Sequence, residues 1–151
     1  MLEKFQEICR ANGWKCTAQR LAIYTFLDHN TTHPDVQSTW EKVRQELPTI
    51  TRESVYRILN EFAEHHLIQR MDHLETAHYD TNTASHGHFF CEKCGAIIDF
   101  ALPPEIRLCD EYKGGKVRTV EVRAVGICQR CTEQIEQAKK PEVSTAEHNN
   151  F

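Results

Sequence analysis

Two cysteine pairs of the Cys-x-x-Cys type, Cys91 with Cys94 and Cys128 with Cys131, have the residue type and spacing best suited to chemistry in this 151-residue chain. Four thiolates in two short clips form a ligand set that Zn²⁺ binds in tetrahedral structural sites. Because 33 residues separate Cys94 from Cys128, one ion bound to both clips would join two distant segments. We therefore predict a four-cysteine structural zinc site, with one Zn(II) in each chain.

His86 and His88 stand just before the first clip and outside it. They are available for a second, more open metal site, where sensing or catalysis could take place. For the cysteines, a redox pair in a single clip and disulfides are the alternatives. The chain starts Met1-Leu2-Glu3-Lys4 without an apolar leader, and it has no apolar run of the ~20 residues that span a bilayer. We expect a cytoplasmic protein, in which disulfides are disfavoured.

Three further cysteines, Cys9, Cys16 and Cys109, lie outside the clips. Unpaired cysteines most often pack as small hydrophobic side chains. We expect all three to be reduced and partly buried, with a redox-sensing role for one of them as the alternative.

The charge of the chain does not favour general nucleic-acid binding. The formal net charge is −4, and residues 1–80 hold 9 Lys and Arg against 12 Asp and Glu. Any contact with DNA must therefore come from a local basic face, with the surplus carboxylates placed elsewhere or used as metal ligands.

The first 80 residues predict three or four helices followed by two short strands. Helical periodicity covers residues 17–27, 35–47 and 49–62, and strand-like segments cover 66–71 and 75–80 on either side of a polar turn. Helices followed by a β-ribbon are typical of a winged helix-turn-helix, in which one helix enters the major groove of DNA. A small helical bundle with a solvated face is the alternative.

The third of these helices carries the candidate reading surface. Thr51 is placed to cap it, and Ile50 and Val55 are placed to form a hydrophobic staple. Apolar residues follow with helical spacing on one face, which leaves Tyr56 and Arg57 on the other faces.

The second half changes to strand-like patterns. The segments that we predict are strands at 89–90, 96–100 and 116–125, a helix at 103–112, a closing helix at 129–140 and a polar tail at 141–151. The last strand is expected to alternate valine on one face with charge on the other. This is a small α/β unit whose sheet a second copy of the chain could complete.

Taken in order along the chain, these motifs resemble the ferric uptake regulator (Fur) superfamily. The resemblance covers residues 5–135 and rests on five segments: Lys15-Cys16-Thr17-Ala18-Gln19-Arg20, His33-Pro34, Ser54-Val55-Tyr56-Arg57-Ile58-Leu59, His86-x-His88-x-x-Cys91-x-x-Cys94-Gly95 and Gly126-Ile127-Cys128-x-x-Cys131. It implies a metal-dependent transcriptional repressor, not an enzyme, that acts as a homodimer on operator DNA with an A·T-rich inverted repeat and has no membrane partner.

The same resemblance implies an α+β fold in three parts. An N-terminal winged helix-turn-helix DNA-binding domain covers residues 1–80, with a hinge at about 80–85. A small α/β dimerisation and metal-binding domain with the four-cysteine zinc site covers 86–140, and 141–151 is the tail.

The resemblance also assigns DNA contacts. Tyr56 and Arg57 match the pair that contacts bases from the recognition helix, and Lys15 matches a residue that reaches the minor groove. Arg20 is expected to contact the DNA backbone or to form a structural ion pair. An arginine suits bidentate recognition of guanine, and a lysine in a narrow A·T-rich groove responds to shape and charge.

The regulatory metal site that the resemblance implies consists of His33, Asp80, His86, His88 and Asp99. Three imidazoles and two carboxylates suit Fe(II) or Mn(II), one per subunit. An aspartate at position 99 resembles the peroxide-sensing PerR branch, because iron sensors usually carry glutamate there. In that branch Fe(II) and hydrogen peroxide oxidise a ligand histidine, which maps onto His33 or His86 and would release the DNA. His78, close to Asp80 in sequence, is the alternative ligand.

Other functions remain as alternatives at this point. An iron-sensing Fur-type repressor of metal-uptake genes is the first of them. A zinc-sensing regulator is disfavoured because no cysteine lies between Cys16 and Cys91. A non-haem iron enzyme would need a substrate cavity, and a zinc-stapled interaction module would leave the first half of the chain unexplained.

Overall fold

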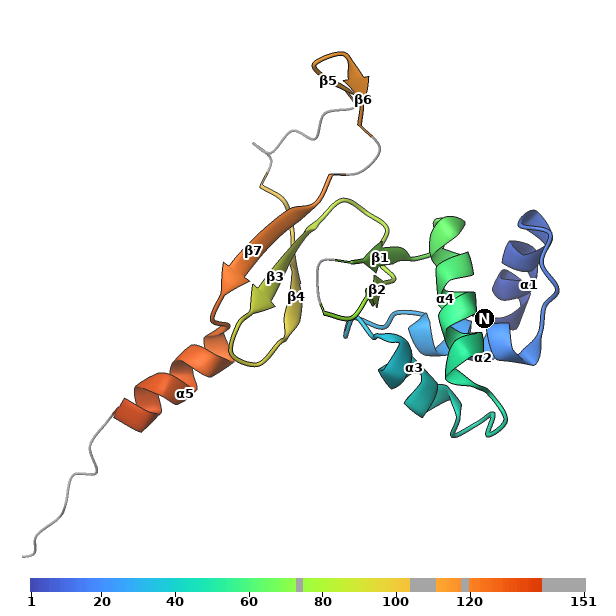
Figure 1. The fold of residues 1–151 in the computed structure, drawn as a ribbon, viewed down its shortest axis with the longest axis horizontal. Helices are drawn as coiled ribbons and strands as arrows, with labels where there is room; N and C mark the ends of the chain where they lie inside the picture. Colours follow the sequence, from blue (N-terminus) through green and yellow to red (C-terminus); the bar gives the residue numbers. More distant parts are fainter. Residues whose placement is uncertain (73–74, 104–110, 118–119, 140–151) are drawn as a thin grey trace, which may run out of the picture. The chain divides into compact units, whose positions relative to one another are not determined.

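The computed structural model describes residues 1–72, 75–103, 111–117 and 120–139. The chain divides by its internal contacts into two compact units, residues 1–84 and 85–151 (Figure 1). Among the described residues, no helix is both long and apolar enough to cross a membrane.

The first unit consists of four helices and a two-stranded ribbon (Figure 1). The elements are α1 Leu2–Ala11, α2 Ala18–Leu27, α3 Val36–Val43, α4 Arg52–Glu64, β1 Gln69–Met71 and β2 His78–Asp80. β1 and β2 are antiparallel, with Gln69 opposite Asp80. This is the predicted order of helices followed by a wing, although each strand is only three residues long.

Helix α4 forms for the reasons that its sequence indicates. The Thr51 side chain accepts a hydrogen bond from the Ser54 backbone N–H (3.1 Å) and so satisfies one of the free donors of the first turn. Ile50 and Val55, the predicted staple, are both buried. The buried face of the helix is Val55, Ile58, Leu59 and Phe62. All four belong to the hydrophobic core of the unit.

Helix α3 ends at Val43, four residues before the predicted Leu47. Leu47 precedes Pro48, and the residue before a proline is disfavoured in helical geometry. Leu47 still packs against the core from a turn, so its apolar contact agrees with the prediction and its helical state does not. Trp40 of α3 donates a hydrogen bond from Nε1 to the Ile50 carbonyl (3.0 Å), which ties α3 to the start of α4.

The second unit has a three-stranded sheet and one helix (Figure 1). The sheet order is β4 (Ile97–Phe100), β3 (Gly87–Cys91), β7 (Val122–Gly126), with β3 antiparallel to β4 and parallel to β7. Helix α5, Gln129–Lys139, follows β7. The three-stranded sheet and α5 match the predicted mixture of helix and sheet.

One predicted helix and one predicted strand need correction in this unit. Of the helix predicted at 103–112, residues 104–110 lie outside the described part, but its last two residues form strand β5 (Glu111–Tyr112), which pairs with β6 (Gly115–Lys116). Lys113 (φ 48°) and Gly114 (φ 82°) allow the tight turn between them.

The strand predicted at 116–125 is not continuous. Lys116 ends β6, Thr119 lies outside the described residues, and β7 begins only at Val122. The expected valine face is also incorrect, because the Val125 side chain is 52% exposed. The predicted tail at 141–151 lies outside the described part of the chain.

Candidate functional site

The four clip cysteines meet at one point in the second unit. Their Sγ atoms all lie within 4.8 Å of one another, and Cys94 Sγ is 3.8 Å from Cys128 Sγ. A tetrahedron with Zn–S bonds of ~2.3 Å places its sulfur atoms about 3.8 Å apart. The arrangement therefore fits a structural zinc ion in both donor type and spacing.

The sheet brings the two clips together. β3 pairs with β7 so that Cys91 lies opposite Gly126, which puts Cys128 two residues beyond the end of the same ladder. The first clip is a turn closed by hydrogen bonds from the Gly95 N–H to the Cys91 carbonyl (2.8 Å) and from the Cys91 N–H to the Ala96 carbonyl (2.9 Å). Gly95 has φ +70°, a conformation that glycine adopts without strain.

Backbone donors prepare the cluster for a cation. The backbone N–H of Cys128 points at the Cys91 sulfur (3.3 Å) and, as the main cause, lowers the pKa of Cys91 to about 6. The Ala96 N–H and, to a smaller extent, the Arg130 guanidinium lower the pKa of Cys94. Burial raises the pKa of Cys131 to about 12. Binding of Zn²⁺ would displace the remaining protons, because zinc binds thiolates.

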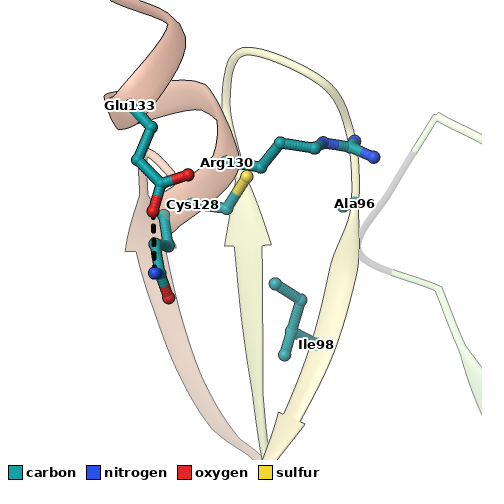
Figure 2. Close-up of a pocket in the computed structure, with 6 residues that line it drawn as sticks. Ala96, Ile98, Cys128, Arg130 and Glu133 are labelled. Carbon is teal, nitrogen blue, oxygen red and sulfur yellow. Dashed lines mark hydrogen bonds between the residues drawn. The ribbon is translucent and has the colours of Figure 1, made fainter. Parts of the chain in front are cut away.

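An open hollow lies beside the cysteine cluster (Figure 2). It is lined by Ala96, Ile98, Cys128, Gln129, Arg130 and Glu133. Figure 2 shows the Arg130 side chain extending from the start of α5 toward Ala96, next to the Cys128 sulfur. Its guanidinium is well placed to balance the negative charge of a zinc ion with four thiolates. Sequence reasoning missed this role, although Arg130 stands between two ligands of the second clip.

A second group of possible ligands lies at the opposite end of the sheet strands of this unit. His88 of β3 is directly opposite Asp99 of β4. The Nε2 atoms of His86 and His88 are 3.0 Å apart, and both lie within 3.7 Å of Asp99 Oδ1. Two imidazoles bound at right angles to one ion with bonds of ~2.1 Å would have the same separation, about 3.0 Å. A Cβ at Gly87 would collide with the Phe100 ring, so the residue between the histidines must be glycine.

The first unit holds the other two predicted ligands close together. His33 Nε2 is 3.8 Å from Asp80 Oδ1, and Asp80 also accepts a hydrogen bond from the Asn82 N–H (2.8 Å). His33 follows α2 in a loop, and its left-handed backbone (φ 50°) is uncommon for a residue other than glycine.

His78 positions this pair. Its Nδ1 lies 2.6 Å from the His33 carbonyl oxygen, and the Tyr79 N–H donates to the Pro34 carbonyl (2.9 Å). The wing strand β2 therefore holds the His33 loop through its backbone. A hydrogen bond with a neighbouring carbonyl favours a supporting role for His78 over the alternative role as a ligand.

The predicted reading surface is exposed on α4. Tyr56 is 49% exposed and Arg57 is exposed, and both line an open hollow with Ser54 and Asn60. Three carboxylates also line it, those of Glu53, Glu61 and Glu64. Lys15 is exposed in the segment before α2. The basic character is thus confined to a few side chains, as the net charge requires.

Arg20 forms the structural ion pair that was one of its two predicted roles. Its guanidinium donates to both carboxylate oxygens of Glu61 in α4 (2.7 and 2.8 Å) and to the Lys15 carbonyl (2.8 Å). The two side chains are only 13% and 23% exposed. This bidentate geometry fixes α2 and the Lys15 segment to the reading helix.

We expect Arg20→Ala to lower the free energy of unfolding of the first unit by about 1–2 kcal/mol, because Glu61 loses a partly buried, charge-assisted partner. Urea unfolding of Arg20→Ala, Glu61→Ala and the double variant would measure the coupling. Additive effects of the two substitutions would show that the pair contributes nothing to stability.

Comparison with known proteins agrees with these motifs. Residues 11–125 match the ferric uptake regulator family. The chain belongs to this family. Members of the Fur family are metal-responsive transcription regulators, and nothing in the described residues indicates catalysis.

Relatives and solved structures of the Fur family resemble most of the chain. The peroxide operon regulator of Bacillus subtilis is 28% identical over 137 residues, 88% of this chain and 94% of that protein. The peroxide-responsive repressor PerR of Staphylococcus aureus is also 28% identical, over 88% of this chain and 93% of that protein. The structure of the Helicobacter pylori ferric uptake regulator matches with a TM-score of 0.68 at 23% identity, over 87% of this chain and 91% of that one, which shows a shared fold.

Proposed function

We propose that this Fur-family protein is a homodimeric repressor that binds operator DNA when Fe(II) or Mn(II) occupies a regulatory site and leaves the DNA when peroxide oxidises that site. The observation that carries the proposal is the ligand set of His86, His88 and Asp99, in which two imidazoles and a carboxylate converge without a thiol. Oxygen and nitrogen ligands suit Fe(II) and Mn(II), whereas a thiolate would favour zinc. The two relatives named for peroxide support the choice of signal.

We assign five residues to the regulatory ion: His33, Asp80, His86, His88 and Asp99. The first two belong to the first unit and the other three to the second. One ion bound by all five would link the units and restrict their relative motion. If only the linked form fits both half-sites of an operator, the metal raises DNA affinity by shifting the population toward that form.

Peroxide would act on the ligands themselves. Bound Fe(II) supplies the electrons that reduce peroxide, which Mn(II) does not readily do. Oxidation of the His33 or His86 imidazole would remove a nitrogen donor from the set, and the ion would then hold the two units less tightly. The DNA-bound population would fall because its stabilising link is lost.

The DNA contacts are assigned to the first unit. Tyr56 and Arg57 are exposed on α4, where base edges in the major groove could reach them, and Lys15 is exposed in the same unit. Arg20 supports this surface by holding the Lys15 carbonyl and Glu61. The homodimer is supported by exposed apolar side chains of the second unit, among them Ile98, Val125 and Ile127.

The test of the peroxide mechanism compares two metals in one protein. Zinc-replete protein is loaded without oxygen with Fe(II) or with Mn(II), and binding to an A·T-rich inverted repeat is measured before and after one equivalent of hydrogen peroxide. We expect the Fe(II) form alone to release the DNA and to carry a 16 Da adduct on His33 or His86. If both forms stay bound and only a chelator releases them, the protein reports iron supply, as an iron-sensing Fur does.

The role of Arg57 can be tested by operator affinity. We expect Arg57→Ala to weaken specific binding by about 1–3 kcal/mol at constant salt, because a base contact is lost. Arg10→Ala is a matched control, since Arg10 is an exposed arginine of α1 that contacts the Gln6 carbonyl. Equal affinities of the two variants would contradict the assignment of Arg57.

A further inference from the structure

A second pair of thiols lies in the first unit, away from both metal-ligand groups. Cys9 is buried in α1 with 2% of its surface exposed, whereas Cys16 is exposed in the segment before α2. The expectation that both would be partly buried is therefore incorrect for Cys16. Both are free thiols in this structure, and the Cys109 of the same expectation lies outside the described residues.

The chain folds back so that the two thiols meet. α1 ends at Ala11, Gly13 (φ +67°) reverses the direction of the chain, and the Trp14 N–H donates to the Cys9 carbonyl (2.8 Å). The Cys16 side chain is a hydrogen-bond partner of the Cys9 thiol. A disulfide requires the sulfur atoms to approach to about 2.0 Å, and thiols already in contact need only a small movement of this loop.

The surroundings of the pair are held in place. Trp14 stacks on Phe62 of α4 (5.4 Å between ring centroids), and the Arg20 guanidinium lies 5.6 Å from the Trp14 ring. Arg20 also binds the carbonyl of Lys15, the residue before Cys16. A change at Cys16 is thus transmitted directly to Lys15 and, through Arg20, to the reading helix.

We propose that Cys9 and Cys16 are a second redox site, which hydrogen peroxide converts into a reversible disulfide that weakens operator binding without involving the regulatory metal. The effect on operator binding rests on the proposed function, but formation of the disulfide does not.

The reaction is a two-electron oxidation of the thiols. The exposed Cys16 thiolate attacks one peroxide oxygen, the O–O bond breaks, and Cys16 sulfenic acid and water result. The Cys9 thiolate then attacks the Cys16 sulfur, the S–S bond forms and the S–O bond breaks, and hydroxide leaves as water with the proton of Cys9. In sum, two thiols are oxidised and one peroxide is reduced to two waters. Burial and the neighbouring Cys16 raise the pKa of Cys9, so the second step should be faster at higher pH.

The sequence allows a direct assay, because trypsin cleaves after Lys4, Arg10, Lys15 and Arg20 and so places Cys9 and Cys16 in separate peptides, residues 5–10 and 16–20. Zinc-replete, Mn(II)-loaded full-length protein is treated with hydrogen peroxide, denatured in N-ethylmaleimide and digested. We expect one linked species, 2 Da below the sum of the two peptides, that disappears with dithiothreitol while the histidines stay unmodified. Complete alkylation of both cysteines, at a peroxide dose that oxidises histidine in the Fe(II) form, would overturn the proposal.

Two variants separate the steps. In Cys9→Ser, the Cys16 sulfenic acid cannot be resolved and should be trapped by dimedone on peptide 16–20. In Cys16→Ser, Cys9 should remain reduced because it is buried. The failure to trap any adduct on Cys16 would overturn the proposed first step.

Operator affinity of the same Mn(II) samples tests the consequence. We expect peroxide to lower the affinity of the wild type by about tenfold, as for the loss of one DNA contact, and dithiothreitol to restore it. Cys16→Ser should keep its affinity after peroxide. Formation of the disulfide with unchanged affinity would overturn the regulatory effect. Absence of metal-dependent operator binding before peroxide would instead contradict the proposed function, and the peptide assay would still decide whether the pair is redox-active.

Discussion

Cys131→Ser should deprive the protein of its structural zinc and unfold the second unit. Among the described residues of that unit, the buried hydrophobic cluster consists of Cys91, Cys128 and Cys131, with Phe89 and Ala96 packed against it. So small a core cannot hold a sheet and a helix by apolar burial alone. Structural zinc contributes roughly 10–16 kcal/mol of apparent binding free energy in small zinc domains. A serine hydroxyl does not replace a thiolate as a ligand.

The measurement is zinc content together with hydrogen exchange. We expect zinc to fall from one ion per chain toward none, and amide protection to be lost in β3, β4 and β7. The first unit should keep its protection because its core, which includes Phe5, Ile23 and Phe62, is separate from the zinc cluster. Cys16→Ser is the matched control, since this exposed cysteine is outside the cluster. Full zinc content in Cys131→Ser would show that the cluster is not the zinc site.

Asp99→Ala should weaken the regulatory metal without disturbing the zinc. The Asp99 carboxylate lies within 3.7 Å of the Nε2 atoms of both His86 and His88, and it is one of two negative charges in the proposed ligand set. Loss of a supporting group around a metal costs 10- to 100-fold in affinity, so we expect the loss of a direct carboxylate ligand to cost at least about 100-fold. Operator binding should then require about 100-fold more Mn(II).

A Mn(II) titration of operator binding checks this result, with zinc content measured in parallel. Glu133→Ala removes the same charge from α5 of the same unit, where the carboxylate accepts a hydrogen bond from Gln129 (2.8 Å) and belongs to neither ligand group. It should titrate as the wild type does. Asp99→Glu, which keeps the charge, should keep most of the metal response. If Asp99→Ala has the wild-type midpoint, Asp99 is not a ligand and the aspartate-based argument for peroxide sensing fails.

The two clusters also differ in what they require of the chain. The zinc cluster is built within one unit, from clips that a parallel strand pair brings together, so it stabilises that unit alone. The proposed regulatory set takes residues from both units and is therefore suited to reporting occupancy to the DNA-binding surface. Stability and response are assigned to different ions for this reason.

Much of the site could be predicted from local sequence. The Cys-x-x-Cys spacing predicts a zinc clip because two thiolates three residues apart reach one ion from a single turn. The cap at Thr51 and the apolar spacing of Val55, Ile58 and Phe62 predict α4 and, with it, the exposure of Arg57. These features depend on residues within one or two turns of each other, so their geometry follows from the chain itself.

Other features depend on residues distant in sequence, and only the tertiary structure decided them. Arg20 is a structural side chain because α4 presents Glu61 to it, 41 residues later, and Cys16 meets Cys9 because the loop after α1 turns back. Glu111 and Tyr112 are a strand because Gly115 and Lys116 pair with them. The sequence by itself determined the ligand types, the helix caps and the apolar faces, since these are local chemistry. The tertiary structure decided which charges and thiols are neighbours, because long-range packing sets those distances.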